Sequence, residues 1–240
     1  MGTEPVVELS IVVPLYNEVG NVDPLVERVE SASDAFPRPW ELIVVDDGST
    51  DGSGERLDEL AASHPNLHPL HFTANCGQSA AMDAGFQHSR GRWVAFLDAD
   101  LQTYPEDIPL LLSKLEEEGV DAVVGIRQQR RDSWWRRFSS SFANGVRNRL
   151  TREDIVDTGC PLKVFRGEAI RSLCAFNGYH RFLPTLLKME GYSVVQVPVR
   201  HTARTAGTSK YGTWDRAFRG LRDALGVRWL QDRHLDWRLR

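Results

Sequence analysis

Two aspartates separated by one residue, Asp98 and Asp100, are the side chains in the sequence best suited to bind a metal ion. They follow the apolar run 94–97, and side chains two apart in an extended segment point the same way. Two carboxylates on one face repel each other unless a cation lies between them, and such hard oxygen ligands suit Mg²⁺ or Mn²⁺. Gln102 lies two residues further on the same face and could add an oxygen. We predict a divalent metal site at Asp98, Asp100 and Gln102, of the kind that also binds substrate phosphates.

Two further acidic groups follow predicted strands. Glu18 comes after the apolar run 9–14, and Asp47 lies in the turn 46–52 that follows the run 42–45. Ligands of open parallel sheets bind beyond the carboxyl ends of the strands. The turn 46–52 has glycines and helix-capping residues, so its role could be structural. Its predicted position beside the Asp98 strand end favours a contact with a base or ribose.

The elements that must position these residues form a βαβα series. Short apolar runs, bounded by polar or turn residues, predict buried parallel strands at 9–14, 42–45, 94–97 and 120–126. Helices are expected between them at about 20–36, 52–63, 76–90 and 105–118. The fold class is therefore α/β, with a mostly parallel central sheet, flanking helices and right-handed crossovers.

The second half of the chain is less regular. Residues 133–150 are helix-like, with apolar side chains every four residues and arginines between them. Residues 192–199 alternate as a strand does, and 214–230 have apolar residues at helical spacing. We predict one domain over 1–212 that includes the helix at 133–150, followed by an amphipathic helix and polar tail at 213–240.

Charge is distributed unevenly in a chain of 240 residues with a net charge of -4. The window 127–152 has eight arginines and one acid, Asp132. Clustered positive charge on a mildly acidic protein predicts a local anionic partner, such as phosphates or a membrane surface, and the net charge gives no indication of nucleic-acid binding.

Cysteines and apolar runs bear on the cellular location. The three cysteines, Cys76, Cys160 and Cys174, are odd in number and have no metal-ligand spacing, which is typical of reduced cytosolic thiols. We find no signal peptide and no apolar run of the ~20 residues that span a bilayer. Any membrane contact is expected to be peripheral, on the cytoplasmic face.

Five segments together resemble glycosyltransferase family two, of the GT-A (Rossmann-like) nucleotide-sugar fold. They are Val-Pro-Leu-Tyr-Asn-Glu at 13–18, Val-Asp-Asp-Gly-Ser at 45–49, Phe-Leu-Asp-Ala-Asp-Leu-Gln at 96–102, Val-Gly-Ile-Arg at 124–127 and the block 201–212. The first three are typical of the family broadly. The Arg-x-x-Gly-x-Ser-Lys-Tyr-Gly pattern within 201–212 narrows the resemblance to polyprenyl-phosphate sugar transferases of the dolichol-phosphate mannose synthase type.

The resemblance implies roles for individual residues. The nucleotide pocket would be lined by Pro14, Tyr16, Glu18, Val45 and Asp47. The metal and diphosphate would be surrounded by Asp98, Ala99, Asp100 and Gln102. Donor or acceptor phosphate would be contacted by Arg127, Arg204 and Lys210. The lipid phosphate would be received by Arg137 and Ser141, in a helix at the membrane interface. Many family members have transmembrane helix pairs after the block 201–212, and we expect none in this chain.

The function implied is inverting transfer of a sugar from a nucleoside-diphosphate sugar to a polyprenyl phosphate, in the synthesis of cell-envelope glycans. The catalytic groups would be Asp98, Asp100, Arg127, Arg204 and Lys210, with a Mg²⁺ or Mn²⁺ cofactor stabilising the departing diphosphate. An acceptor that is already an anion needs little help from a base. Asp157 could be a base or could cap a turn.

Several alternatives stay open. The helix at 133–150 could face the core in place of a membrane. The acceptor could be a soluble or protein-bound hydroxyl, in which case Asp157 would be required as base. The chain could also be a non-catalytic membrane-associated subunit that keeps the nucleotide pocket as a scaffold.

Overall fold

The computed structural model of the chain describes residues 6–127, 145, 148–202 and 213–235. Outside these ranges lie four predicted site residues: Arg137, Ser141, Arg204 and Lys210. Most of the predicted helix at 133–150 lies outside them as well. The roles given to these residues remain predictions from the sequence.

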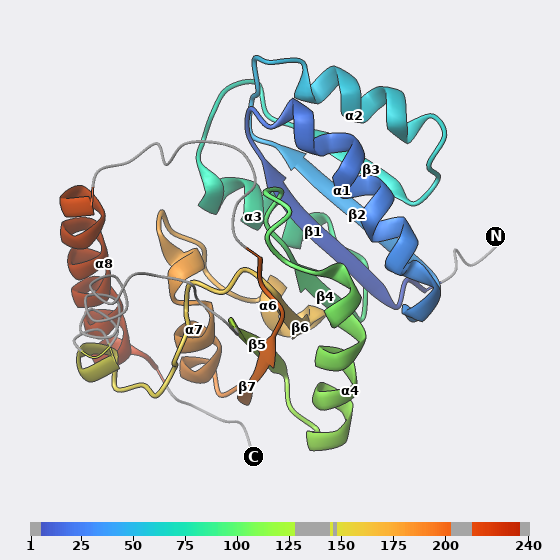
Figure 1. Ribbon diagram of the computed structural model, residues 1–240. Helices are drawn as coiled ribbons and strands as arrows, with labels where there is room; N and C mark the ends of the chain where they lie inside the picture. The colour runs from blue at the N-terminus through green and yellow to red at the C-terminus, as the bar shows by residue number, and fades with distance from the viewer. Residues whose placement is uncertain (1–5, 128–144, 146–147, 203–212, 236–240) are drawn as a thin grey trace.

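One seven-stranded sheet forms the centre of the fold, in the order β3-β2-β1-β4-β6-β5-β7 (Figure 1). The strands are β1 (Leu9–Leu15), β2 (Trp40–Asp46), β3 (Leu67–His71), β4 (Trp93–Phe96), β5 (Ala122–Arg127), β6 (Lys163–Arg166) and β7 (Val194–Val199). Neighbours run parallel except at β6, which is antiparallel to both β4 and β5. The prediction of an α/β fold with a mostly parallel sheet is confirmed.

The apolar runs predicted as strands are β1, β2, β4 and β5, and the predicted strand at 192–199 is β7. Every residue of β2 and of β4 is buried. A strand is buried on both faces only when helices cover both, and here they do. The continuous apolar runs in the sequence therefore follow from the layered architecture.

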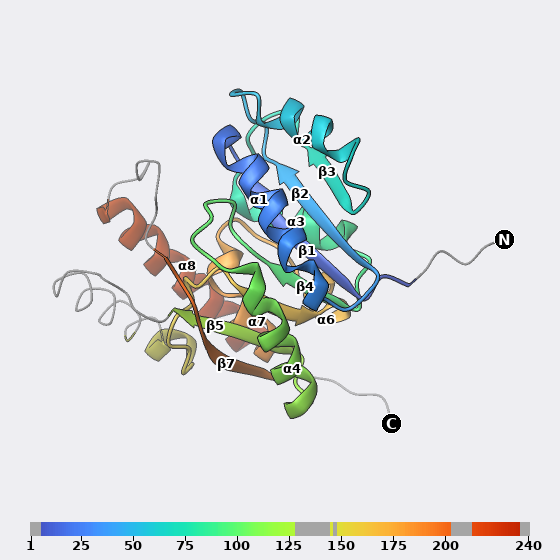
Figure 2. The same ribbon diagram turned by 45° about the vertical axis from the view of Figure 1, so that its right-hand side comes forward.

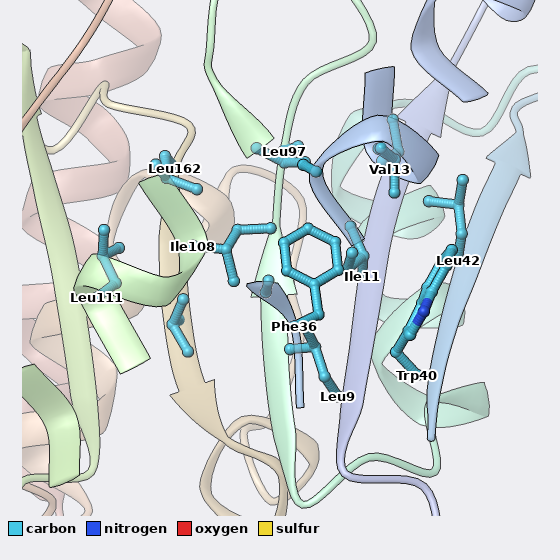
Figure 3. Packing of buried hydrophobic residues seen from close by; sticks show 14 of the residues in the cluster. Leu9, Ile11, Val13, Phe36, Trp40, Leu42, Leu97, Ile108, Leu111 and Leu162 are labelled. Carbon is cyan, nitrogen blue, oxygen red and sulfur yellow. The ribbon is translucent and has the colours of Figure 1, made fainter. Parts of the chain in front are cut away.

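One face of the sheet is covered by α1 (Val19–Ala32), α2 (Ser53–Ala61) and α4 (Ile108–Glu118). Figure 3 shows the core beneath them, where Ile11 and Val13 of β1 lie with Phe36 and Ile108 in one buried cluster. Short 3-10 turns, η1 (Ser33–Ala35) and η2 (Pro105–Asp107), adjoin α1 and α4. Gly119 ends α4 in the left-handed conformation, with φ 62°, as its position after the helix predicts.

The opposite face is covered by α3 (Gln78–His88), α6 (Gly167–Arg171), α7 (Leu183–Met189) and α8 (Thr213–Arg233), with the 3-10 turn η3 (Tyr179–Arg181) (Figure 2). Gly85 lets α3 approach the sheet, because an added Cβ would lie 2.4 Å from Val12 Cγ1. Among the described residues, no helix combines the length and apolarity needed to cross a membrane.

Candidate active site

The loops after β1 and β2 are joined by hydrogen bonds at the carboxyl edge of the sheet. Asn17 N donates to Ser49 Oγ at 2.9 Å, and Thr50 N donates to Asn17 Oδ1 at 2.8 Å. Glu18 N donates to Ser53 Oγ at 3.2 Å. These bonds hold Asn17 at a positive φ of 52°. They fix the backbone on both sides of an open edge, where a ligand is expected to bind.

The residues predicted to line a nucleotide pocket do not all reach the surface of this edge. Tyr16 is 37% exposed, and Pro14 is half-buried beside Val45 in the parallel register of β1 and β2. Val45 itself is fully buried, against α3. Glu18 accepts a hydrogen bond from Asn21 Nδ2 at 2.8 Å. Pro14 and Tyr16 therefore form the accessible part of this wall, and Val45 supports it from within the core.

Asp47 is buried and holds the loop that precedes α3. Its Oδ1 accepts from Cys76 N at 2.7 Å, and its Oδ2 accepts from Asn75 Nδ2 and Gly77 N, both at 2.9 Å. Gly48 is required beside it, because a Cβ there would lie 2.5 Å from the Ala74 carbonyl carbon. In this structure, the Asp47 carboxylate thus makes structural contacts, and the loop that it holds lies at the candidate site.

Asp98 and Asp100 follow β4 directly, and the buried Ala99 lies between them. Both aspartates are partly exposed, but strand β4 ends at Phe96 and residues 99 and 100 lie in a turn, so the extended segment that the prediction assumed is not present. Asp98 Oδ1 accepts from Gln78 Nε2 in the first turn of α3, at 3.2 Å. Asp100 Oδ2 accepts from Gln102 Nε2 at 2.8 Å. The side-chain oxygen of Gln102 is thereby left for another partner.

The donor set at this edge fits a divalent metal ion. In the described part of the chain, no three His, Cys, Asp or Glu side chains form a group that could hold an ion unaided. Mg²⁺ commonly takes one or two carboxylates and completes its shell with water and substrate phosphate. Asp98 and Asp100 provide two carboxylates, and Gln102 provides an amide oxygen. The site therefore suits a metal that arrives with, or is completed by, a phosphate ligand.

Arg127 ends β5 at the same edge and forms a bidentate ion pair with Asp157. Its Nε lies 2.7 Å from Oδ2 and its NH2 lies 2.8 Å from Oδ1, and the side chains are 17% and 7% exposed. A general base needs an oxygen that faces the proton it removes, and here both Asp157 oxygens face Arg127. This geometry favours a role for Asp157 in orienting Arg127 over a role as base.

Lys163, the first residue of β6, was not among the predicted site residues, although only 3% of its surface is exposed. It pairs with Phe96 at the end of β4, and its Nζ lies 5.7 Å from the Phe96 ring centroid. Nζ also donates a hydrogen bond to the Cys160 carbonyl oxygen. Burial lowers the pKa of Lys163, while the charges of Asp98 and Asp157 act in the opposite direction. A single lysine before an apolar strand gives no sequence signal of this position.

His180 connects η3 to the start of α3. Its Nδ1 lies 2.8 Å from Ser79 Oγ, which also accepts a hydrogen bond from Gly178 N at 2.9 Å. Burial, with Arg181 and Lys163 nearby, lowers the pKa of His180 to about 3. The ring is therefore neutral at physiological pH, and its Nδ1 shares a hydrogen bond with the Ser79 hydroxyl. This contact gives His180 a structural role, because it ties η3 to the first turn of α3.

At the end of β7 the chain lies beside residues 98–102, which we call the metal-site loop. Thr103 and His201 form an isolated bridge, and Thr202 N donates to the Gln102 carbonyl oxygen at 3.0 Å. The segment 203–212 begins at the next residue and lies outside the described ranges. Thr202, the last described residue before that segment, is therefore beside Gln102. One edge of the sheet thus gathers Asp98, Asp100 and Gln102, the Arg127–Asp157 pair and the buried Lys163.

The chain is similar in sequence to glycosyltransferases. The family model described as glycosyl transferase family 2 matches residues 10–174. The chain is 40% identical over 224 residues to dodecaprenyl-phosphate galacturonate synthase of Rhizobium johnstonii, covering 92% of this chain and 66% of that protein. It is 39% identical over 206 residues to undecaprenyl-phosphate 4-deoxy-4-formamido-L-arabinose transferase of Edwardsiella ictaluri, covering 85% and 63%. The chain thus spans somewhat less than two thirds of the length of these curated relatives.

Solved structures share the fold at lower sequence identity. The mannosyltransferase PcManGT from Pyrobaculum calidifontis, in complex with GDP-Man and Mn²⁺, has a TM-score of 0.62 at 20% identity and covers 93% of this chain and 69% of its own. Glucosyl-3-phosphoglycerate synthase from Mycobacterium tuberculosis, in complex with Mn²⁺, UDP and glucosyl-3-phosphoglycerate, has a TM-score of 0.67 at 18% identity and covers 95% and 81%. The fold is the GT-A fold of these glycosyltransferases.

Proposed function

This chain belongs to glycosyl transferase family 2, and from that premise we propose that it transfers a sugar from a nucleoside-diphosphate sugar to a polyprenyl phosphate. An acceptor phosphate oxygen attacks the anomeric carbon of the sugar from the side opposite the diphosphate. The bond from that carbon to the diphosphate oxygen breaks, and the nucleoside diphosphate leaves with the electron pair. The product is a lipid-linked monosaccharide of inverted anomeric configuration, formed at the cytoplasmic face of the membrane.

The observation that carries the proposal is the meeting of acids and cations at one edge of the sheet. Asp98 and Asp100 face outward after β4, and Arg127 ends β5 at that edge. Departure of a diphosphate builds negative charge, which preorganised cations stabilise. The edge thus has ligands for a metal and a guanidinium for phosphate. Arg204 and Lys210 would add cations from the segment that begins beside Gln102.

A divalent metal at this site would neutralise the diphosphate and act as a Lewis acid toward it. Asp98 and Asp100 would hold the ion, with the Gln102 amide oxygen as a further ligand. Their partial exposure leaves the site open to the donor. The nucleotide would lie along the edge of β1 and β2, where Pro14 and Tyr16 are accessible.

The acceptor class is supported by the ion pair of Asp157. A hydroxyl acceptor requires a base, but both carboxylate oxygens of Asp157 accept hydrogen bonds from Arg127. A phosphate acceptor is already an anion and needs cations to align it in place of a base. The two bacterial relatives, a dodecaprenyl-phosphate and an undecaprenyl-phosphate sugar transferase by name, agree with this chemistry.

Peripheral membrane contact is part of the proposal. We place the catalytic domain at residues 1–212 and a helix and polar tail at 213–240, and the helix α8 ends at Arg233. Ala224 and Val227 of α8 are buried, while Leu221, Leu225 and Trp229 form an exposed row at four-residue spacing. An exposed apolar row on an arginine-rich helix suits a membrane interface. The Trp- and Phe-containing segment at 133–150, with Arg137 and Ser141, would add a second contact.

The proposal is tested by following nucleoside diphosphate release from a panel of nucleotide sugars in the presence of Mn²⁺. The acceptors are undecaprenyl phosphate, the corresponding alcohol undecaprenol and buffer alone. We expect release with the phosphate only. Release with undecaprenol would favour the hydroxyl-acceptor alternative. Metal-dependent nucleotide binding without turnover of any lipid would favour the scaffold alternative.

A further inference from the structure

Lys163 is a basic side chain in a place where a positive charge is costly. Its exposed fraction is 3%, and lysines are rarely buried to this extent unless they are paired. Taking an ammonium group out of water into a protein interior is energetically unfavourable. The fold retains this group at the amino end of β6, where strand β6 meets the carboxyl end of β4.

The local packing does not require a charge at Lys163. The Cys160 carbonyl oxygen needs a hydrogen-bond donor, and a neutral amide would provide one. The contact with the Phe96 ring could equally be made by a methionine of similar length. Replacement of a buried charge by an apolar residue of similar volume is often neutral or stabilising. The positive charge therefore exceeds what the local structure needs.

The immediate neighbours of Lys163 lie within a few residues of the charged groups of the proposed active site. Phe96, its partner in the sheet, is two residues before Asp98. The Cys160 carbonyl that it contacts belongs to the turn that starts at Asp157, since Cys160 N approaches the Asp157 carbonyl oxygen at 3.3 Å. Val124, its partner on the other side, is three residues before Arg127. Lys163 thus lies between the metal-site loop and the Arg127–Asp157 pair.

We propose that Lys163 is a positioning residue whose positive charge, on the strand beside the Asp98 loop, makes the site bind a metal together with a diphosphate in preference to the metal alone. The inference rests on the proposed function. A buried cation repels a free divalent ion held by Asp98 and Asp100, and it attracts the diphosphate that accompanies the ion. Charges at such positions are screened far less than exposed ones. The donor and its metal would therefore enter as one complex.

The test measures the affinity for Mn²⁺ alone and the affinity for a nucleoside diphosphate with Mn²⁺, and we expect the two to change in opposite directions. Lys163→Met and Lys163→Gln both remove the charge, and the glutamine keeps a donor for the Cys160 carbonyl. Lys114→Met, on the surface of α4, removes one positive charge away from the site. Mn²⁺ binding without nucleotide is followed by the free-ion electron paramagnetic resonance signal. Binding of UDP and GDP at saturating Mn²⁺ is followed by calorimetry.

We expect each neutral Lys163 variant to bind Mn²⁺ alone about fivefold more tightly and to bind the nucleoside diphosphate with Mn²⁺ about fivefold more weakly. Lys114→Met should match the original protein in both. Loss of both affinities together, or no change in either, would overturn the inference while the proposed function stands. If the unmodified protein binds neither Mn²⁺ nor a nucleotide, the proposed function fails and the inference fails with it. Should Lys163→Met not fold, Lys163→Gln decides.

Discussion

Each charged side chain at the carboxyl edge of the sheet is held in place by a hydrogen bond or ion pair to a neighbour. Arg127 is held by Asp157, Asp98 is contacted by Gln78, and Asp100 is contacted by Gln102. Each contact fixes a group that would otherwise be free to turn away from a ligand. Preorganisation of this kind makes electrostatic stabilisation effective, because the groups need not reorganise during the reaction.

The Arg127–Asp157 pair gives a prediction at this scale. Asp157→Asn keeps the shape but removes one charge from a largely buried pair, so we expect the free energy of unfolding to fall by about 3 kcal/mol. Turnover should fall, while the pH dependence of kcat/KM should keep its shape because no base is lost. Chemical denaturation and pH-rate profiles measure the two effects.

Asp154→Asn is the matched control, because Asp154 forms an exposed pair with Lys188 at 2.8 Å. Its effect on unfolding should be about 1 kcal/mol or less. Disappearance of the acidic limb of the pH-rate profile in Asp157→Asn would instead identify Asp157 as the base.

The sequence predicts part of this site for a physical reason. The apolar run of β4 and the two acids that follow it are close together in the sequence, so their position at a strand end could be predicted, although the turn at 99 and 100 could not. The partners Gln78, Lys163 and Asp157 reach the edge from other elements, and no spacing in the sequence reports those contacts. Asp47 shows the same limit, because its carboxylate is bound by a loop about 30 residues away, with Gly77 N at 2.9 Å.

At the scale of elements, close packing of α3 on β1 and β2 sets the wall of the site. Gly85 is the point of approach, since an added Cβ would lie 2.4 Å from Val12 Cγ1 and 3.2 Å from Val45 Cγ2. Core overpacking costs about 1–3 kcal/mol, which exceeds the gain in helix propensity from alanine. This contact fixes α3, and with it the position of Gln78 beside Asp98.

We therefore predict that Gly85→Ala lowers the melting temperature by about 2–4 °C for each kcal/mol lost. Gly20→Ala is the control, because Gly20 lies in α1 with nothing within 4 Å of the added Cβ. That variant should be as stable as the original or slightly more stable. Equal melting temperatures for the two variants would contradict the packing described for α3.

His71 gives a pH-dependent prediction for the connection between β3 and α2. Burial alone would lower its pKa, but hydrogen bonds to Asp46 at 3.2 Å and Asp58 at 3.1 Å outweigh burial and raise it. A raised pKa in the folded state stabilises the protein below the unfolded value of about 6.5, and this stability is lost as the pH rises through the folded value. The stability difference between the original protein and His71→Asn should thus be larger at about pH 5.5 than at about pH 8.5.

Unfolding curves in urea at both pH values measure that difference, and Asp58→Asn should reduce its pH dependence. A difference that grows with pH would contradict the hydrogen bonds assigned to His71.

Elements that the sequence left unpredicted are short or polar. β3 (Leu67–His71) contains Pro69 and two histidines, and such a strand is tolerated because β3 lies at the edge of the sheet. β6 (Lys163–Arg166) is four residues long and begins and ends with a cation. It forms because β4 and β5 provide partners on both sides, which is tertiary context. The longer apolar runs could be predicted as strands without knowledge of their partners.

At the scale of the whole molecule, α8 lies on the side of the fold away from α1 and α2 (Figures 1 and 2). Ala224 and Val227 of α8 pack against the body of the protein, and Leu225 and Trp229 are exposed. The sequence predicted the helix but left open whether its apolar residues pack on the domain or meet a membrane. Two sets of apolar residues on one helix allow both contacts.

We predict that Leu225→Glu and Trp229→Glu each reduce cosedimentation with vesicles that contain anionic phospholipid. Each change removes apolar surface from the interface and adds a charge that anionic lipid repels. Leu110 on α4 is exposed to a similar extent, and Leu110→Glu should leave cosedimentation unchanged. Equal loss in all three variants would show that the exposed row of α8 is not the contact.

The central claim is that the Asp98–Asp100 edge performs metal-dependent sugar transfer to a polyprenyl phosphate. The most direct test measures radiolabelled sugar entering the organic phase with undecaprenyl phosphate and Mn²⁺. We predict incorporation by the original protein, loss with EDTA, and a fall of at least about 100-fold in Asp98→Asn and Asp100→Asn, because their carboxylates would hold the metal that stabilises the leaving diphosphate. Sugar transfer that persists in EDTA or in both variants would contradict the account.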